Sequence, residues 1–442
     1  MSSANGALPP GPGGLALRQT AEYVWRPLRL FEEAQRRYGD AFTLRLQGMP
    51  PTVVLADPDA VRDVYTASPE LLRSGEANER LQAALGRRSL IVLDGAAHLR
   101  ERKLLLPPFH GERMRLYGDL IAGVAERRLA AWEPGRPFAV AKTMRGIALE
   151  VILRAVMGLD ADDERMRRAE RAFTRLLDAT APPYRLFTLF LVKPGGAFMR
   201  AWERTAPTMR RVDRVIYDEI ERGRSDPHLE EREDILAMLL QARDEDGRPM
   251  PDEHLRDELV TMLAAGHETT ATALAWALER LARAPEVLDR VTEEVRSGGD
   301  GDDYLDAVAK ETLRLRTIVP FSIRRLAAPA TIGGIDLPAG VNVAPCVHLV
   351  HRNPRIYPDP DAFRPERFLE QPAGTYTWIP FGGGTRRCIG ASFAVFEMKT
   401  VLATLLRLGR PVAPDGAAAE TVGRRGITFA PARGGRVVWR PG

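Results

Sequence analysis

The chain has 442 residues, of which 45% are hydrophobic and 28% are charged, as expected for a globular protein with a large buried core. The formal net charge of +4 gives no case for nucleic acid as a partner. No apolar run approaches the roughly 18 residues of a membrane span, so no membrane anchor is expected. The two cysteines, Cys346 and Cys388, are too few for a disulfide framework. They favour a reducing, cytoplasmic setting, although one bridge between them stays open.

The N-terminal part of the chain predicts short elements. Residues 1–15 include a stretch rich in proline and glycine and predict an extended or disordered lead-in. Residues 41–46 and 52–56 alternate in polarity around a turn at Gly48 to Pro51, which predicts a hairpin. Asp57 followed by Pro58 predicts the capped start of a helix that ends near Thr66.

The rest of the chain predicts helices with small strands. The longest helical pattern covers residues 252–283, between Pro251 and Pro285, and would be roughly 48 Å long. Further helices are expected at 304–316 and from 389 to about 408, with strand-like pieces at 331–350 and 427–439. The sum is a mainly α fold with small β-sheets (α+β), in one domain over 1–442.

The segment that indicates chemistry reads Phe381-Gly-Gly-Gly-Thr-Arg-Arg-Cys388-Ile-Gly390. The three glycines let the backbone approach something flat and large. The cysteine stands at the expected start of a helix, whose free N–H groups and dipole favour a thiolate, and Arg386 and Arg387 add positive charge. Such a thiolate is a suitable ligand for haem iron. The alternative, an inert buried cysteine, leaves the glycines and arginines unexplained, whereas Cys346 lies in an apolar run and is taken as structural.

The spacing Phe381-x-x-Gly384-x-Arg386-x-Cys388-x-Gly390 resembles the haem-binding signature of cytochromes P450. Three further segments follow in the family's order, and the resemblance covers nearly the whole chain. It implies the cytochrome P450 fold and haem b (iron protoporphyrin IX) as cofactor. Cys388 would be the metal ligand, and Phe381, Arg386 and Gly390 would also contact the haem.

The first further segment reads Ala265-Gly-His-Glu-Thr-Thr270, in the middle of the longest predicted helix. The small pair at its start leaves room beside a ligand, and the threonine hydroxyls favour a local bulge. By the resemblance, Ala265 and Thr269 contact the haem, and Glu268 and Thr269 relay protons to bound dioxygen. An ordinary polar patch is the alternative. A zinc-protease motif is excluded, because Ala271 stands where that motif needs histidine.

The second segment places Glu311 and Arg314 three residues apart on one helix face, where they can pair. In isolation a surface pair would be the ordinary interpretation. The resemblance implies that Arg367 joins them in a structural network around the haem.

The third segment contains His98 and Arg102, four residues apart on one helix face. By the resemblance they hold a haem propionate, although many relatives have tryptophan in place of His98. Arg324 and Arg386 are the other propionate candidates, because the arginine fork suits carboxylates. Arg325 is adjacent to Arg324 and leaves that assignment open.

The parts that would contact substrate are the least specific. By analogy the pocket includes Leu259, Ala265, Val319, Phe321 and Ile427, which favours an apolar substrate. The same side chains could equally be core packing.

The resemblance implies a monooxygenase that inserts one atom of O2 into a lipid-like substrate such as a fatty acid, alkane or terpenoid. Electrons would come from a ferredoxin or flavodoxin with its reductase. A peroxide-using peroxygenase and a non-catalytic haem protein that binds a ligand are the alternatives.

Overall fold

The computed structural model describes residues 8–109, 113–191, 207–243, 246–298 and 301–442. Its helices are α1 (Ala16–Trp25), α2 (Pro27–Tyr38), α3 (Pro58–Thr66), α4 (Ser74–Ala77), α5 (Gln82–Leu85), α6 (Gly95–Leu105), α7 (Arg113–Leu129), α8 (Ala141–Met157), α9 (Glu164–Thr180), α10 (Pro183–Leu191), α12 (Pro207–Arg224), α13 (Ile235–Gln241), α14 (Asp252–Ala282), α15 (Pro285–Ser297), α16 (Asp303–Leu315), α17 (Val347–His351), α18 (Arg367–Glu370) and α19 (Ala391–Leu408). Short 3-10 turns are η1 (Glu79–Leu81), η2 (Pro107–Phe109), η3 (Leu229–Glu231) and η4 (Gly384–Arg386). Among these, no helix is long and apolar enough to cross a membrane.

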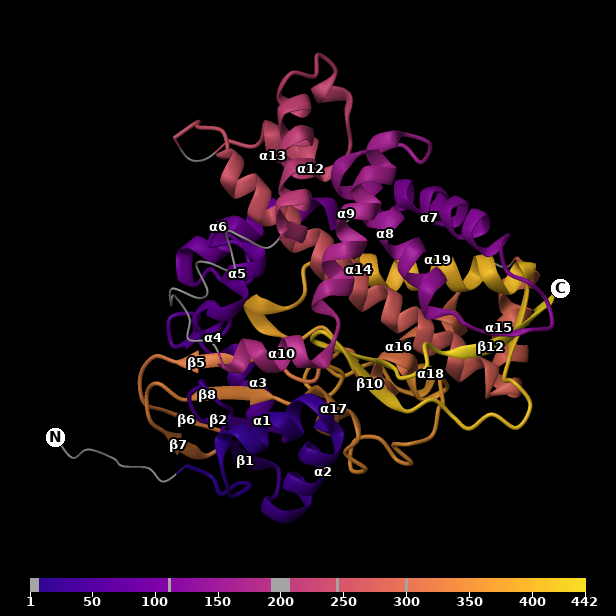
Figure 1. The fold of residues 1–442 in the computed structure, drawn as a ribbon. Helices are drawn as coiled ribbons and strands as arrows, with labels where there is room; N and C mark the ends of the chain where they lie inside the picture. The colour runs from indigo at the N-terminus through magenta and orange to yellow at the C-terminus, as the bar shows by residue number, and fades with distance from the viewer. Residues whose placement is uncertain (1–7, 110–112, 192–206, 244–245, 299–300) are drawn as a thin grey trace.

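Helix α14 is the longest element and runs through the middle of the helical region (Figure 1). It packs against α8, α12, α16 and α19. Residues 271–279 are buried without interruption, so this part of the helix is covered on all sides. The predicted helix at 252–283 differs from the observed one by a single residue, because Pro251 and Pro285 flank it in the sequence.

The strands are β1 (Ala41–Leu44), β2 (Thr52–Leu55), β3 (Leu72–Arg73), β4 (Pro137–Ala139), β5 (Arg324–Leu326), β6 (Ala330–Ile332), β7 (Ile335–Leu337), β8 (Asn342–Pro345), β9 (Gly409–Val412), β10 (Val422–Arg425), β11 (Thr428–Pro431) and β12 (Arg436–Pro441). The largest sheet has the order β1-β2-β8-β5-β3. The predicted hairpin is confirmed as antiparallel β1 and β2, with Ala41 opposite Leu55. Strand β2 also pairs in parallel with β8, which brings distant parts of the chain together.

Three smaller sheets complete the β structure. Strands β6 and β7 form a hairpin, and β4, β12 and β9 form a three-stranded sheet. The hairpin of β10 and β11 turns between Arg425 and Thr428, and β11 packs against α14. The hairpin tip therefore lies beside the middle of the molecule's central helix.

Local sequence signals set the N-terminal elements. The side chain of Asp57 accepts hydrogen bonds from the backbone N–H groups of Asp59 and Ala60, so α3 begins where the sequence predicts. Residues 8–15 precede α1 without forming a helix or strand. Part of this lead-in is held to β1, because Thr43 donates hydrogen bonds to the carbonyl oxygens of Pro9 and Pro10.

Candidate functional site

Cys388 lies in a tight loop between η4 and α19. Its backbone N–H donates a hydrogen bond of 2.9 Å to the carbonyl oxygen of Phe381, which closes the loop. A Cβ atom at Gly383 or Gly384 would lie 2.2 Å or 2.1 Å from atoms of Tyr65, and Gly384 has φ +63°. Two of the three glycines are therefore needed for packing against α3, whereas the sequence suggested close approach to a flat ligand.

The surroundings of the Cys388 thiol act on its pKa in opposite directions. The residue is exposed to solvent, yet surrounding protein raises the pKa of its thiol by burial. The backbone N–H of Gly390 and the charges of Arg102 and Arg387 act in the opposite direction. Helix α19 begins only at Ala391, so the predicted lowering of the pKa by a helix start at Cys388 does not dominate. Binding of a metal ion would displace the proton and favour the thiolate.

The second cysteine has a different environment. Cys346 is fully buried between β8 and α17, and burial raises the pKa of its thiol to about 12. This agrees with the structural role expected for it, because a buried thiol in apolar surroundings is inert.

Four basic side chains from α6, β5 and η4 act on one another near the cysteine loop. Burial, together with the charges of Arg386 and Arg102, lowers the pKa of His98 to about 3. Burial also lowers the pKa of Arg386 to about 10; Asp94 opposes this shift, while Arg324 and Arg102 add to it. Asp94 is the only acidic residue that contributes to the pKa shifts of His98 and Arg386. This excess of buried positive charge fits a ligand with carboxylate groups.

Free donor atoms decide which of these side chains can bind such a ligand. Arg324 donates one hydrogen bond of 2.9 Å to the Gly383 carbonyl, and its buried Nη1 has no partner within the described residues. Nδ1 of His98 is also buried and has no hydrogen-bond partner among the described residues. Arg325 instead donates to Asn342 at 2.6 Å. Of these two arginines, Arg324 is therefore the one with an unpartnered buried donor.

Arg386 is largely engaged by the protein itself. Its guanidinium donates to Asp94 at 2.6 Å, to the carbonyl oxygen of Leu90 at 3.2 Å and to that of Leu93. The sequence suggested a direct role in holding a ligand carboxylate. Most of its donors tie the cysteine loop to the chain before α6, and its role toward a ligand carboxylate stays a prediction.

Ala265 and Thr269 occupy the middle of α14. Ala265 is exposed, although most of its neighbours along this helix are buried. The hydroxyl of Thr269 donates a hydrogen bond of 2.7 Å to the carbonyl oxygen of Ala265. The predicted bulge is wrong, because α14 is regular α-helix throughout and this hydrogen bond spans one ordinary turn. The turn nevertheless presents a small side chain and a hydroxyl to open space.

The next residues hold α14 against α8. A Cβ atom at Gly266 would lie 3.0 Å from a side-chain atom of Ile152, so this glycine allows two helices to pack closely. His267 is buried, and its Nε2 lies 3.0 Å from the carbonyl oxygen of Arg145. Burial lowers the pKa of His267 to about 4, so the ring is neutral at pH 7. Both residues position the helix that carries Glu268 and Thr269.

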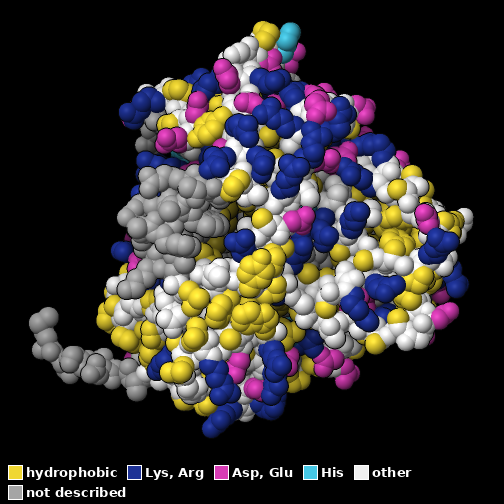
Figure 2. Space-filling view, in the orientation of Figure 1, with side chains coloured by type: hydrophobic (Ala, Val, Ile, Leu, Met, Phe, Trp, Pro, Cys, Tyr) yellow, Lys and Arg dark blue, Asp and Glu magenta, His cyan; other side chains and the backbone are white. Residues whose placement is uncertain are grey.

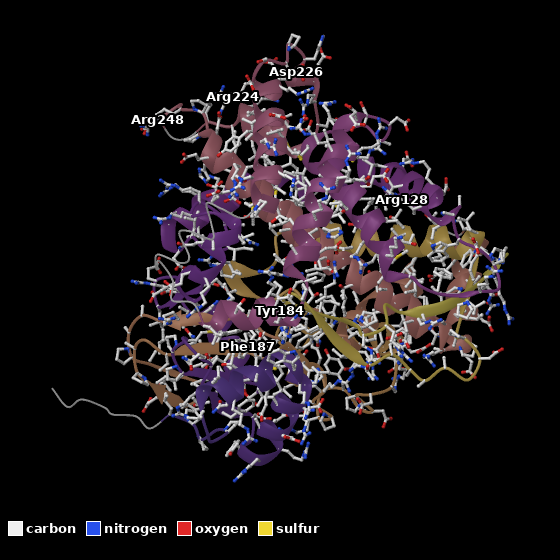
Figure 3. The ribbon with its side chains drawn as sticks, viewed as in Figure 1. Arg128, Tyr184, Phe187, Arg224, Asp226 and Arg248 are labelled. Atoms are coloured by element: carbon white, nitrogen blue, oxygen red, sulfur yellow. The ribbon has the colours of Figure 1, made fainter. Side chains whose placement is uncertain are left out.

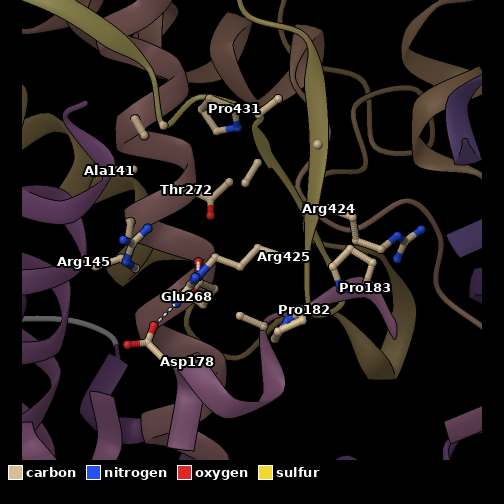
Figure 4. Close-up of a pocket in the computed structure, with 17 residues that line it drawn as sticks. Ala141, Arg145, Asp178, Pro182, Pro183, Glu268, Thr272, Arg424, Arg425 and Pro431 are labelled. Carbon is tan, nitrogen blue, oxygen red and sulfur yellow. Dashed lines mark hydrogen bonds and ion pairs between the residues drawn. The ribbon is translucent and has the colours of Figure 1, made fainter. Parts of the chain in front are cut away.

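Glu268 lies in a pocket of about 430 Å³ formed by α8, α9, α14 and the β10–β11 hairpin (Figure 4). It pairs with Nε of Arg425 at 3.0 Å, and Arg425 also pairs with Asp178 at 2.6 Å. Burial raises the pKa of Glu268, while Arg425 and Arg145 act in the opposite direction. No local pattern predicts this pairing, because its members come from the three separate elements α9, α14 and β10.

Glu311, Arg314 and Arg367 form a buried ionic group. Arg314 donates to both oxygens of Glu311, at 2.6 and 2.8 Å, and Arg367 approaches Glu311 at 3.1 Å. Arg314 also donates to three backbone carbonyl oxygens, among them those of His351 and Pro360. Because Glu311 and Arg314 are fully buried, the group joins α16 to the loop before α18 rather than facing solvent.

The predicted substrate contacts differ in their exposure to solvent. Leu259 is fully buried in the main core, and Phe321 packs against the rings of Tyr23 and Phe31, so both serve packing. Val319 is partly buried against the main core. Ile427 at the hairpin tip is 49% exposed, and Ala265 is exposed in α14. Apolar side chains in a large fold mostly fill its core, so the sequence pattern alone does not separate pocket residues from core residues.

The donor set fits a haem. Cys388 offers an accessible sulfur, Arg324 and His98 offer unpartnered buried nitrogen atoms, and Ala265 leaves space along α14. A soft sulfur ligand suits iron, and the surplus of positive charge suits two propionate groups. When bound, the haem supplies the iron that binds and activates dioxygen.

Comparison with known proteins identifies the family of the chain. Residues 9–412 match the family model described as Cytochrome P450. Cytochrome P450 135B1 of Mycobacterium bovis is 43% identical over 404 residues, covering 90% of this chain and 84% of the relative. Cytochrome P450 138 of Mycobacterium tuberculosis is 40% identical over 437 residues, covering 98% and 96%.

Solved structures show the same fold. The retinoic acid-bound cyanobacterial CYP120A1 superposes with a TM-score of 0.83 at 24% identity, covering 99% of this chain and all of that one. The haem domain of cytochrome P450DA gives the same TM-score at 23% identity, covering 99% and 98%. The chain therefore belongs to the cytochrome P450 family of haem-thiolate monooxygenases.

Proposed function

We propose that this monooxygenase inserts one atom of O2 into an apolar, lipid-like substrate, such as a fatty acid, alkane or terpenoid. Its electrons would come from a ferredoxin or flavodoxin with its reductase, and its cofactor would be haem b. The observation that carries the proposal is the accessible Cys388 sulfur beside a buried surplus of positive charge. In this proposal Arg324, His98 and Arg102 hold the propionates.

The loop around Cys388 and its basic neighbours have separate tasks in this proposal. Phe381 and Gly390 shape the loop, since one accepts the backbone N–H of Cys388 and the other directs its own N–H toward the sulfur. Arg386 fixes the loop through Asp94. The Glu311, Arg314 and Arg367 group holds the surrounding core in register.

Glu268 and Thr269 are proposed to handle protons. Because burial raises the pKa of Glu268, its carboxyl holds a proton more readily than an exposed glutamate does. Arg425 limits that shift and keeps the carboxyl at the pocket of Figure 4, where solvent protons can reach it. Thr269 Oγ1, one residue further along α14, would pass a proton toward the space beside Ala265.

Replacing Thr269 by alanine should uncouple electron use from product formation. The haem should still accept electrons, but without the hydroxyl the product per NAD(P)H consumed should fall about 10-fold or more, with hydrogen peroxide released instead. Product, peroxide and reductant would be measured with ferredoxin and its reductase. Thr270→Ala is the control, because that adjacent threonine is buried and should keep the wild-type ratio.

The outcome also separates the alternatives. Full coupling in Thr269→Ala would remove Thr269 from proton transfer. Wild-type product formed only with added peroxide would identify a peroxygenase. No product from any lipid-like compound under either condition would point to a non-catalytic haem protein.

An apolar surface supports the substrate class. Figure 2 shows hydrophobic side chains gathered over the region of α1 and α10. Figure 3 labels Tyr184 and Phe187 on α10. Tyr184 is 54% exposed and Trp25 on α1 is 52% exposed, and the ring centroids of Trp25 and Phe187 lie 5.0 Å apart. An exposed apolar patch of this kind is typical of surfaces that meet apolar molecules.

A panel of ligands tests this class. We expect fatty acids, alkanes or terpenoids to shift the haem absorption spectrum of the oxidised protein at micromolar concentrations, while small polar compounds leave it unchanged. Spectral titration measures this directly. A response restricted to the polar compounds would contradict the proposed substrate class.

We also propose a cytoplasmic location and a single domain over 1–442. Neither Cys346 nor Cys388 forms a disulfide, which suits a reducing compartment. Cell fractionation that recovers the protein outside the cytoplasm would contradict the location. Unfolding of the holoprotein in two separate transitions would contradict the single domain.

A further inference from the structure

A second cluster of ligand-type side chains lies between α6 and α14, apart from the cysteine loop. It consists of Glu101 on α6 and of His254 and Glu258 on α14. His254 and Glu258 are four residues apart and therefore share one face of their helix. One nitrogen or oxygen atom from each of the three side chains lies within 4.8 Å of the other two.

Four buried polar atoms of this cluster lack hydrogen-bond partners among the residues that the structure describes. They are both carboxylate oxygens of Glu258, Oε1 of Glu101 and Nε2 of His254. Glu258 is fully buried, and Glu101 is 4% exposed. Nε2 of His254 lies 3.0 Å from Oε2 of Glu101, but the two atoms do not form a hydrogen bond. Buried polar atoms without partners are costly, so this concentration of them calls for a ligand.

The side chains whose charges act on Glu258 favour a positively charged partner. The charges that act on Glu258 come from Glu101 and Asp257, and both are negative. The backbone N–H of Leu90 favours the ionised form, although it makes no hydrogen bond of good geometry to either oxygen. Asp257 is itself paired with Arg256 at 2.9 Å, so that arginine is already in use.

We propose that Glu101, His254 and Glu258 bind a divalent transition-metal ion, Zn²⁺ foremost, with water completing the coordination. Two carboxylates and one imidazole form a nitrogen and oxygen donor set that Zn²⁺ accepts. Ligand atoms at about 2.0–2.2 Å from a tetrahedral zinc ion lie roughly 3.3 Å apart. The 3.0 Å separation of His254 and Glu101 is close to that value, and an oxygen atom of Glu258 lies within 4.8 Å of both other ligand atoms. The His254 side chain is 20% exposed and gives the ion access from solvent.

The ion would clamp α6 to α14. Glu101 directly precedes Arg102, and α6 also carries His98, whereas α14 carries Glu268 and Thr269 further along. A metal bridge would therefore fix the helix with the propionate candidates relative to the helix with the proton-handling candidates. Because it binds the folded protein only, it would also stabilise the fold.

A proton on Glu258 is the competing way to relieve the buried charge. Glu258→Gln imitates that neutral form in shape and charge and should fold normally. It removes only the ability to bind a cation.

The test uses haem-saturated protein, in which Cys388 is occupied, dialysed against a chelator and titrated with Zn²⁺. We expect one Zn²⁺ per chain by equilibrium dialysis and a rise in Tm of about 3 °C on saturation. Glu258→Gln and His254→Ala should each weaken binding about 100-fold and lose the rise in Tm. His228→Ala is the matched control, because His228 is exposed and pairs with Glu231 at 3.3 Å outside the cluster.

The proposal is overturned if the wild type binds no stoichiometric Zn²⁺. It is equally overturned if Glu258→Gln and His254→Ala bind it as tightly as the wild type, or if only His228→Ala loses it. The readouts do not depend on turnover, so a negative result leaves the monooxygenase proposal untouched.

Discussion

Cys388→Ala is expected to lose the haem-thiolate absorption spectrum completely. The sulfur of Cys388 is the accessible thiol of the chain, and burial raises its pKa, so only bonding to iron keeps it deprotonated at neutral pH. Alanine offers no ligand atom, and any haem that remains bound would have water or another weak ligand below the iron. The measurement is the absorption spectrum of the reduced, carbon monoxide-treated variant, with haem content determined on the same sample.

Cys346→Ala provides the matched control for this experiment. Cys346 is the other cysteine, but it is fully buried and its raised thiol pKa keeps it protonated. The control should retain the wild-type spectrum, with at most a modest loss of stability from the removed sulfur. A thiolate spectrum that persists in Cys388→Ala, or that disappears in Cys346→Ala, would refute the ligand assignment.

Glu311→Ala is expected to lower the free energy of unfolding by about 3–5 kcal/mol, because it leaves two buried guanidinium groups without their shared carboxylate. Arg314 is fully buried and Arg367 is 8% exposed, so water cannot replace the lost partner. Haem retention should fall as well, since the group ties α16 to the chain before α18. Chemical denaturation monitored by circular dichroism would give the free energy, and absorption would give the haem content.

An exposed ion pair provides the comparison for this loss of stability. Glu33 pairs with Arg29 at 2.7 Å, a similar distance, but both side chains are more than half exposed. Glu33→Ala should therefore change stability by about 1 kcal/mol or less. Equal losses in the two variants would show that burial of the Glu311 group has no special importance.

Local signals predicted the elements that they control directly. Pro251 and Pro285 enclose α14, and Asp57 with Pro58 starts α3, because capping and proline geometry act within a few residues. The order of the large sheet was not predictable in this way. Strand β2 pairs with β8, nearly 300 residues later, and no short-range pattern encodes that contact.

The candidate site also contains residues that local sequence patterns indicate and residues that only the folded structure brings together. The loop around Cys388 and the pair of Glu311 and Arg314 are contiguous or lie on one helix face, so motif and spacing indicate them. The partner of Glu268, Arg425, comes from a separate hairpin and appears only in the folded structure. The cluster at Glu258 was missed for the same reason, since Glu101 reaches it from another helix.

Some expectations failed because one residue type serves several purposes. Gly383 and Gly384 permit contact with Tyr65, and Gly266 permits contact between α14 and α8, although each was first attributed to a ligand. Leu259 is fully buried, and Phe321 is partly buried against a hydrophobic cluster, so core packing alone would account for both apolar positions. Sequence pattern identifies small or apolar positions, but packing decides which neighbour they meet.

The central claim is that the sulfur at position 388 binds haem iron as a thiolate. Purified wild-type holoprotein should be reduced, exposed to carbon monoxide and scanned across the Soret region. The account predicts a maximum strongly shifted to the red of that given by a histidine-ligated haem. A fresh, intact, haem-saturated preparation with the histidine-type maximum would contradict it.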